Sequence, residues 1–85
     1  MGFERRANLT IKEEFVEKFG WDCTPRLEWT NGTLYADTSR KDEVDLIKET
    51  LEWYSGGYKV LTSCLKATDV EPWDQWAFDI TGEKI

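Results

Sequence analysis

The sequence predicts a single α+β domain in which two helices cover one face of an antiparallel sheet of four to five strands. Three observations predict this class: an Asn-Gly hairpin signal, two segments with apolar residues at helical spacing, and two later segments that alternate. A chain of 85 residues is too short for a second core, so residues 1–85 are expected to form one domain. The expected order of elements is αββαββ.

The first helix is predicted over residues 10–19. Thr10 and Glu13 have the spacing of a capping box, in which each side chain binds a backbone amide at the start of a helix. Gly20 suits the left-handed position that ends a helix. The apolar stripe of this helix consists of Ile11, Phe15 and Phe19, with Val16 beside it.

The residues before this helix, 3–9, allow two interpretations. Phe3, Arg5, Ala7 and Leu9 alternate with polar residues, but the alternation is weak. If this segment were a strand, the first six elements would follow the ferredoxin-like order βαββαβ, with one strand added at the C-terminus.

The strongest local signal is the hairpin around Asn31-Gly32. This dipeptide favours a type I′ turn because both residues tolerate positive φ. The two-residue loop fixes the register, in which Thr30 opposes Thr33, Trp29 opposes Leu34, Glu28 opposes Tyr35, Leu27 opposes Ala36 and Arg26 opposes Asp37. One face then carries Leu27, Trp29, Leu34 and Ala36, which predicts a sheet with one core face.

A second helix is predicted from Ser39 to the Gly56-Gly57 pair. Asp42 and Glu43 fall in its first turn, where the helix dipole favours negative charge. Its apolar stripe consists of Val44, Ile47, Leu51 and Tyr54, flanked by Leu46 and Trp53.

Two strands are predicted in the last part of the chain, over residues 58–67 and 75–81. The first has large apolar groups on both faces, which favours an interior strand or one covered on both sides. The second aligns Trp76, Phe78 and Ile80 on one face. Residues 68–73 are expected to form a loop, and residues 82–85 a short tail.

Composition argues against several classes of function. With 11 basic and 17 acidic residues the net charge is −6, which disfavours direct binding to nucleic acid or to an anionic membrane. The sequence has neither a signal-peptide pattern nor an apolar run long enough to span a membrane. Cys23 and Cys64 are therefore expected to be reduced, partly buried thiols in a cytoplasmic protein.

The side chains offer little for catalysis. The chain contains no His, so neither cysteine can have a His base and the usual zinc ligand sets are incomplete. Asp69, Glu71 and Asp74 lack the spacing of a calcium loop and are interpreted as a solvated loop. We therefore expect no enzyme activity, no cofactor and no bound metal.

The aromatic content points to binding by surface contact. Twelve of the 85 residues are aromatic and five are Trp, and Trp and Tyr are favoured anchors of interfaces. Trp29 and Trp76 fall on apolar strand faces and are assigned to the core. The candidate interface residues are Trp21, Tyr35, Trp53, Tyr54, Tyr58 and Trp73.

The first functional hypothesis is a non-catalytic protein-interaction module that forms a homodimer through an aromatic sheet face or an edge strand. An alternative is an acidic inhibitor or decoy, of a kind that a phage could encode, which captures a basic nucleic-acid-binding protein. This alternative relies on the acidic residues of both predicted helices. A third hypothesis is a small ligand-binding protein or a carboxylate-based enzyme.

Overall fold

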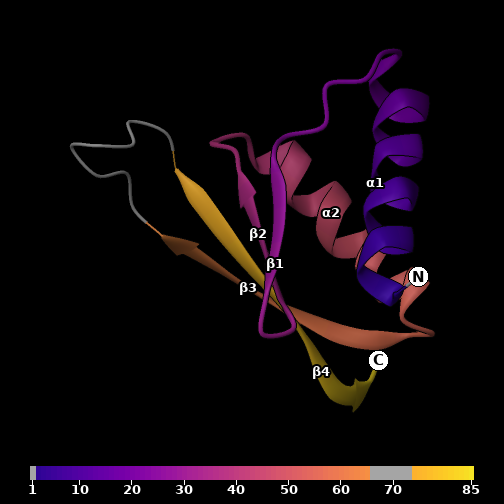
Figure 1. Cartoon of the computed structure of the whole chain (residues 1–85), viewed down its shortest axis with the longest axis vertical. Coiled ribbons are helices and arrows are strands. Elements are labelled where there is room, and N and C mark those ends of the chain that lie inside the picture. Colours follow the sequence, from indigo (N-terminus) through magenta and orange to yellow (C-terminus); the bar gives the residue numbers. More distant parts are fainter. Residues whose placement is uncertain (1, 66–73) are drawn as a thin grey trace.

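A computed structural model describes residues 2–65 and 74–85 of the chain (Figure 1). Two helices and four strands follow in the predicted order αββαββ. They are α1 (Phe3–Phe19), β1 (Leu27–Thr30), β2 (Thr33–Asp37), α2 (Lys41–Tyr54), β3 (Tyr58–Leu65) and β4 (Gln75–Lys84). The predicted loop 68–73 and the end of the predicted strand 58–67 lie outside the described residues.

The four strands form one antiparallel sheet in the order β1-β2-β4-β3. The hairpin register is confirmed from Thr30 opposite Thr33 to Leu27 opposite Ala36. Asn31 and Gly32 both have positive φ, 52° and 81°, as a type I′ turn requires. The Asp37 N–H donates to the Arg26 carbonyl, which extends the pairing to the last predicted partners.

Helix α1 begins at Phe3, so the predictions of a start at Thr10 and of a strand over residues 3–9 are wrong. Phe3 and Ala7 continue the four-residue spacing of Ile11 and Phe15, and Ala7, Ile11 and Phe15 are buried in the core. Phe3, at the start of this stripe, is 42% exposed and contacts the rings of Trp29 and Tyr54. The Thr10 hydroxyl does not cap the helix but donates 3.0 Å to the Arg6 carbonyl inside it. The ferredoxin-like alternative is therefore excluded, because the element before β1 is one continuous helix.

The core lies between the helices and one face of the sheet. Its fully buried members are Ala7, Ile11 and Phe15 of α1, Ile47 and Leu51 of α2, and Leu34, Ala36, Val60 and Phe78 of the sheet. The two helices run antiparallel, since the Phe3 ring lies 5.1 Å from Tyr54 while the Phe19 ring lies under Arg40. Trp29 and Trp76 pack against this core and are half-buried, as their strand positions predict.

The start of α2 differs slightly from the prediction. The helix begins at Lys41, and Ser39 does not cap it. Thr38 stabilises this end instead, because its hydroxyl donates to Glu43 at 2.6 Å and accepts the Arg40 N–H at 3.1 Å. The predicted stop is confirmed, since the helix ends before Gly56 and Gly57, which both have φ of 93°.

The last two strands correct two further predictions. β3 is an edge strand that pairs only with β4 in the described sheet, and Leu61 on its outer face is 50% exposed. The prediction of an interior strand or of one covered on both sides is therefore wrong. β4 continues to Lys84, so residues 82–84 are not a tail. Both strands extend beyond the helical layer at the Leu65 and Gln75 end (Figure 1), and Cys64 is accordingly exposed although it lies on the helix side of the sheet.

Candidate interaction surface

The predicted interface residues do not form one patch. Trp21 and Trp53 are 67% and 69% exposed, so both indoles are accessible to a partner. Trp21 follows the end of α1 and Trp53 is near the end of α2. Because the helices are antiparallel, these two indoles lie at opposite ends of the helical layer.

The tyrosines occupy three different surroundings. Tyr54 is half-buried and packs against the core beside Phe3. Tyr58 lies under the Lys84 ammonium group, 4.4 Å from its ring centroid. Tyr35 points to the uncovered face of the sheet, where Glu28 and Ala77 are its cross-strand neighbours. Trp73 lies outside the described residues.

The uncovered sheet face is mostly polar. Thr33 donates to Asp79 across β2 and β4, and Gln75 donates to Asp37 at 3.0 Å. Tyr35 is the one aromatic residue that the register places on this face among the described residues. The polar side chains of this face bond to one another across β2 and β4. Because these polar pairs occupy the face, it offers little apolar surface away from β3.

Apolar surface gathers at the β3 edge instead. Leu61 and Leu65 are 50% and 41% exposed on the uncovered face, with Ser63 between them. The segment Leu61–Leu65 contains neither a charged residue nor Pro. Charges and Pro are the usual means by which proteins prevent pairing at a sheet edge, so this edge is open to another strand.

The hydrogen bonds of Val60 establish which backbone groups face outward. Its N–H donates 3.0 Å to the Glu52 carboxylate of α2 rather than to β4. In an antiparallel strand, alternate residues direct their N–H and C=O groups to the same side. Thr62 and Cys64 therefore also direct these groups away from β4, toward the free edge.

Glu52 blocks the end of this edge nearest to α2. Its carboxylate also receives the Lys48 ammonium group at 3.0 Å and is largely buried. Burial raises the pKa of Glu52, but the hydrogen bonds from Val60 and Lys48 outweigh burial and hold the pKa below its usual value. The carboxylate therefore stays ionised near neutral pH. Among the described residues of β3, it leaves Thr62 and Cys64 for a pairing strand.

Most carboxylates of α2 have basic partners. Asp45 pairs with Lys41, Glu52 with Lys48, and Arg40 with both Asp42 and Glu43. These ion pairs interrupt the acidic row on which the decoy hypothesis depends. Glu49 and Glu14, by contrast, have no ion pair or hydrogen bond with a described residue.

The remaining sequence candidates give no assembled site. Asp69 and Glu71 lie outside the described residues, and the Asp74 N–H donates to the Ser39 hydroxyl. Within residues 2–65 and 74–85, no three His, Cys, Asp or Glu side chains gather closely enough to hold a metal ion. Both cysteines are free; Cys23 is half-buried as predicted, whereas the prediction of burial is wrong for the exposed Cys64.

Comparison with known protein families, curated proteins and solved structures gives no significant match for this chain. Within the described ranges, neither helix has the length and apolar character needed to cross a membrane.

The interface residues predicted from the sequence do not include Leu61, Ser63 and Leu65. The signal that could have identified them is the uncharged run from Val60 to Leu65. Apolar residues on both faces resemble an interior strand equally well, so the sheet order was needed to distinguish the two cases.

Proposed function

We propose that this protein is a non-catalytic interaction module that acts as a homodimer through the edge strand β3. The observation that carries the proposal is the open, uncharged edge from Leu61 to Leu65. Antiparallel pairing of two copies would join their four-stranded sheets into one continuous sheet. The absence of His from the sequence supports a role in binding rather than in acid–base catalysis.

The outward groups select one register for this pairing. A two-fold axis at Ser63 places Thr62 of one copy opposite Cys64 of the other, so each outward-facing residue gains a hydrogen-bonded partner. An axis at Thr62 would instead require the Val60 N–H, which Glu52 already occupies. Within the described part of β3, the axis at Ser63 therefore pairs the outward backbone groups of Thr62 and Cys64 and does not require the Val60 N–H.

The same register brings the exposed leucines together. Leu61 of one copy lies opposite Leu65 of the other, and this contact occurs twice about the axis. Cross-strand apolar pairs of this kind stabilise a sheet by about 0.2–1 kcal/mol each. The pairing therefore covers apolar surface that the single copy leaves in water.

Leu61→Lys tests this interface against a matched control. The substitution places two ammonium groups in the joined edge and removes both Leu61 contacts, so we expect the dimer dissociation constant to rise at least about tenfold. Leu9→Lys is the control because Leu9 is 54% exposed on the outer face of α1, away from β3. The measurement is sedimentation equilibrium across a concentration series that reaches tens of micromolar.

The wild type and Leu9→Lys are expected to approach twice the 10.0 kDa mass of the chain as concentration rises. Leu61→Lys should stay at the monomer mass in the same range. A wild-type chain that remains monomeric throughout, or an equal effect of both substitutions, would rule out dimerisation through β3.

We also propose a cytoplasmic location. Two free thiols, one of them exposed, support it because such thiols persist in reducing compartments. The exposed Cys64 lies within the proposed pairing segment, so oxidation of this thiol would alter the edge that the dimer uses.

A further inference from the structure

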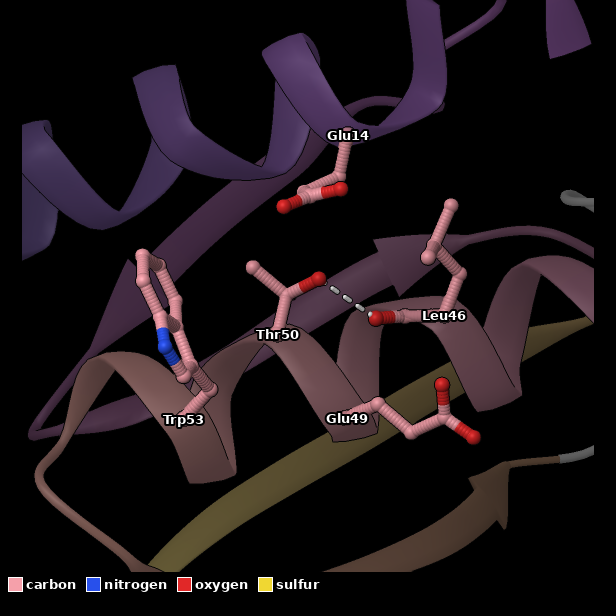
Figure 2. Close-up of a pocket in the computed structure, with 5 residues that line it drawn as sticks. All are labelled: Glu14, Leu46, Glu49, Thr50 and Trp53. Carbon is pink, nitrogen blue, oxygen red and sulfur yellow. Dashed lines mark hydrogen bonds between the residues drawn. The ribbon is translucent and has the colours of Figure 1, made fainter. Parts of the chain in front are cut away.

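A small pocket lies between α1 and α2, on the side of the molecule formed by the helices (Figure 2). Its volume is about 150 Å³, and it is open to solvent. The residues that line it are Glu14 of α1 and Leu46, Glu49, Thr50 and Trp53 of α2.

The walls of this pocket differ in character. Leu46 and Thr50 are buried and form its floor. Trp53 stands at one end with its indole directed toward α1, and Glu14 projects from α1 toward α2 (Figure 2). Among the described residues, the nearest ring partner of the indole is Tyr54, 6.4 Å away, and the Trp53 side chain is 69% exposed, so its open face is available to a ligand.

The polar groups of the pocket are almost all acceptors. The Thr50 hydroxyl donates its proton to the Leu46 carbonyl at 2.7 Å, so only its lone pairs remain. Among the described residues, Glu14 and Glu49 have no partner, and the pocket lining contains no Lys or Arg. An aromatic face beside unpaired carboxylates is complementary to a cation that carries several hydrogen-bond donors.

We propose that this pocket binds a single arginine side chain presented by a partner protein. A planar guanidinium group can stack on the Trp53 indole while its N–H groups reach the Glu14 carboxylate. An ammonium group offers neither the stacking plane nor the forked donors. The volume is below the 300–1,000 Å³ typical of small-molecule sites, which favours one side chain over a metabolite.

The net charge of −6 supports a protein source for this arginine, because it attracts a basic segment over distances of about a Debye length. The pocket lies on the helical layer and the β3 edge on the sheet, and they share no residue. Arginine binding and dimerisation therefore use separate surfaces, and each proposal can fail while the other holds.

Titration with a short blocked peptide, Gly-Arg-Gly, tests the site. The readout is the chemical shift of the Trp53 indole N–H and the Thr50 amide in ¹⁵N-labelled protein. We expect saturable shifts at both groups, and a peptide with citrulline in place of arginine should produce none, because citrulline has the same shape without the charge. The corresponding lysine peptide should bind more weakly.

Matched variants separate the pocket from general charge attraction. Glu14→Gln, read at both probes, should weaken binding about twofold to fivefold. Trp53→Leu, read at the Thr50 amide, should weaken it by a similar factor because the cation–π contact is lost. Glu13→Gln and Trp21→Leu change the same residue types outside the pocket and should leave the affinity unchanged.

Three results would overturn the proposal: equal binding of the citrulline or lysine peptide, unsaturable shifts over many acidic residues, or equal losses in the control variants. Variants are compared only where their remaining amide shifts match the wild type. A smaller peptide-induced shift in a variant then results from the changed pocket and not from misfolding.

Discussion

At the residue scale, Glu52 connects the helical layer to the sheet edge. Its carboxylate accepts the Val60 N–H of β3 and the Lys48 ammonium group of its own helix. One side chain thereby satisfies an edge amide that has no strand partner. Trp29 makes a comparable connection at the opposite edge of the sheet, in β1, where its indole N–H donates 2.8 Å to Asn8 of α1.

Glu52→Gln should make stability less dependent on pH. The folded-state pKa of Glu52 lies below its usual value of about 4.3, so its ionised form stabilises the fold above that pH. This contribution is lost as pH falls through the folded-state pKa. At pH 7 we expect the free energy of unfolding of Glu52→Gln, measured by urea titration, to be about 1–2 kcal/mol lower than that of the wild type. The reason is that hydrogen bonds to a charged acceptor are lost.

The difference between Glu52→Gln and the wild type should shrink as the pH is lowered well below 4. Glu13→Gln, on the exposed face of α1, is the control and should change stability little at any pH. If the free energies of unfolding of Glu52→Gln and the wild type differ by a constant amount across this pH range, the charge at position 52 does not contribute to stability.

At the element scale, the hairpin and both helix stops could be predicted because each depends on local chemistry. Asn31-Gly32 specifies its own turn, and Gly20 and Gly56 adopt the positive φ that ends or follows a helix. The start of α1 could not be found in this way. Phe3 and Ala7 fit a helix only as part of a stripe with Ile11, whereas over seven residues they also fit alternation.

The position of β3 shows a second limit of local patterns. Val60 is fully buried and Leu61 is half exposed, although both are apolar neighbours in one strand. The sequence of β3 does not indicate which strands lie beside it, since its position in the sheet depends on long-range pairing with β4. The pocket was missed for a similar reason, because Glu14 and Trp53 meet only when α1 and α2 pack.

At the scale of the whole molecule, charge and apolar surface act in opposite directions. Two copies with a net charge of −6 repel each other, while Leu61 and Leu65 favour their association. For the arginine pocket, the same negative charge is favourable, because it attracts the cationic ligand. Ionic strength therefore distinguishes the two proposed interactions.

Added NaCl should strengthen the dimer and weaken peptide binding. The Debye length falls from about 10 Å at 0.1 M salt to about 3 Å at 1 M, which removes most repulsion between the copies. Over this range we expect the dimer dissociation constant to fall several-fold in sedimentation equilibrium. A dimer that dissociates as salt rises would instead be held by ion pairs, contrary to the proposed apolar edge.

The most direct test of the account is a disulfide across the proposed two-fold axis. In the paired edge, Ser63 of one copy opposes Ser63 of the other in a non-hydrogen-bonded pair, with Cα atoms about 4.5 Å apart. This separation is within the range that a disulfide spans. Ser63→Cys, made together with Cys64→Ser to remove the neighbouring thiol, should therefore crosslink rapidly in a glutathione redox buffer.

Lys59→Cys in the same Cys64→Ser background is the matched control, since Lys59 is also exposed on β3 and shares the face of Ser63. At about 3.3 Å per residue, its two copies would lie roughly 26 Å apart in this register. We expect non-reducing electrophoresis to show a covalent dimer for Ser63→Cys and a monomer for Lys59→Cys. Equal crosslinking of the two variants, or none for Ser63→Cys, would contradict dimerisation through β3.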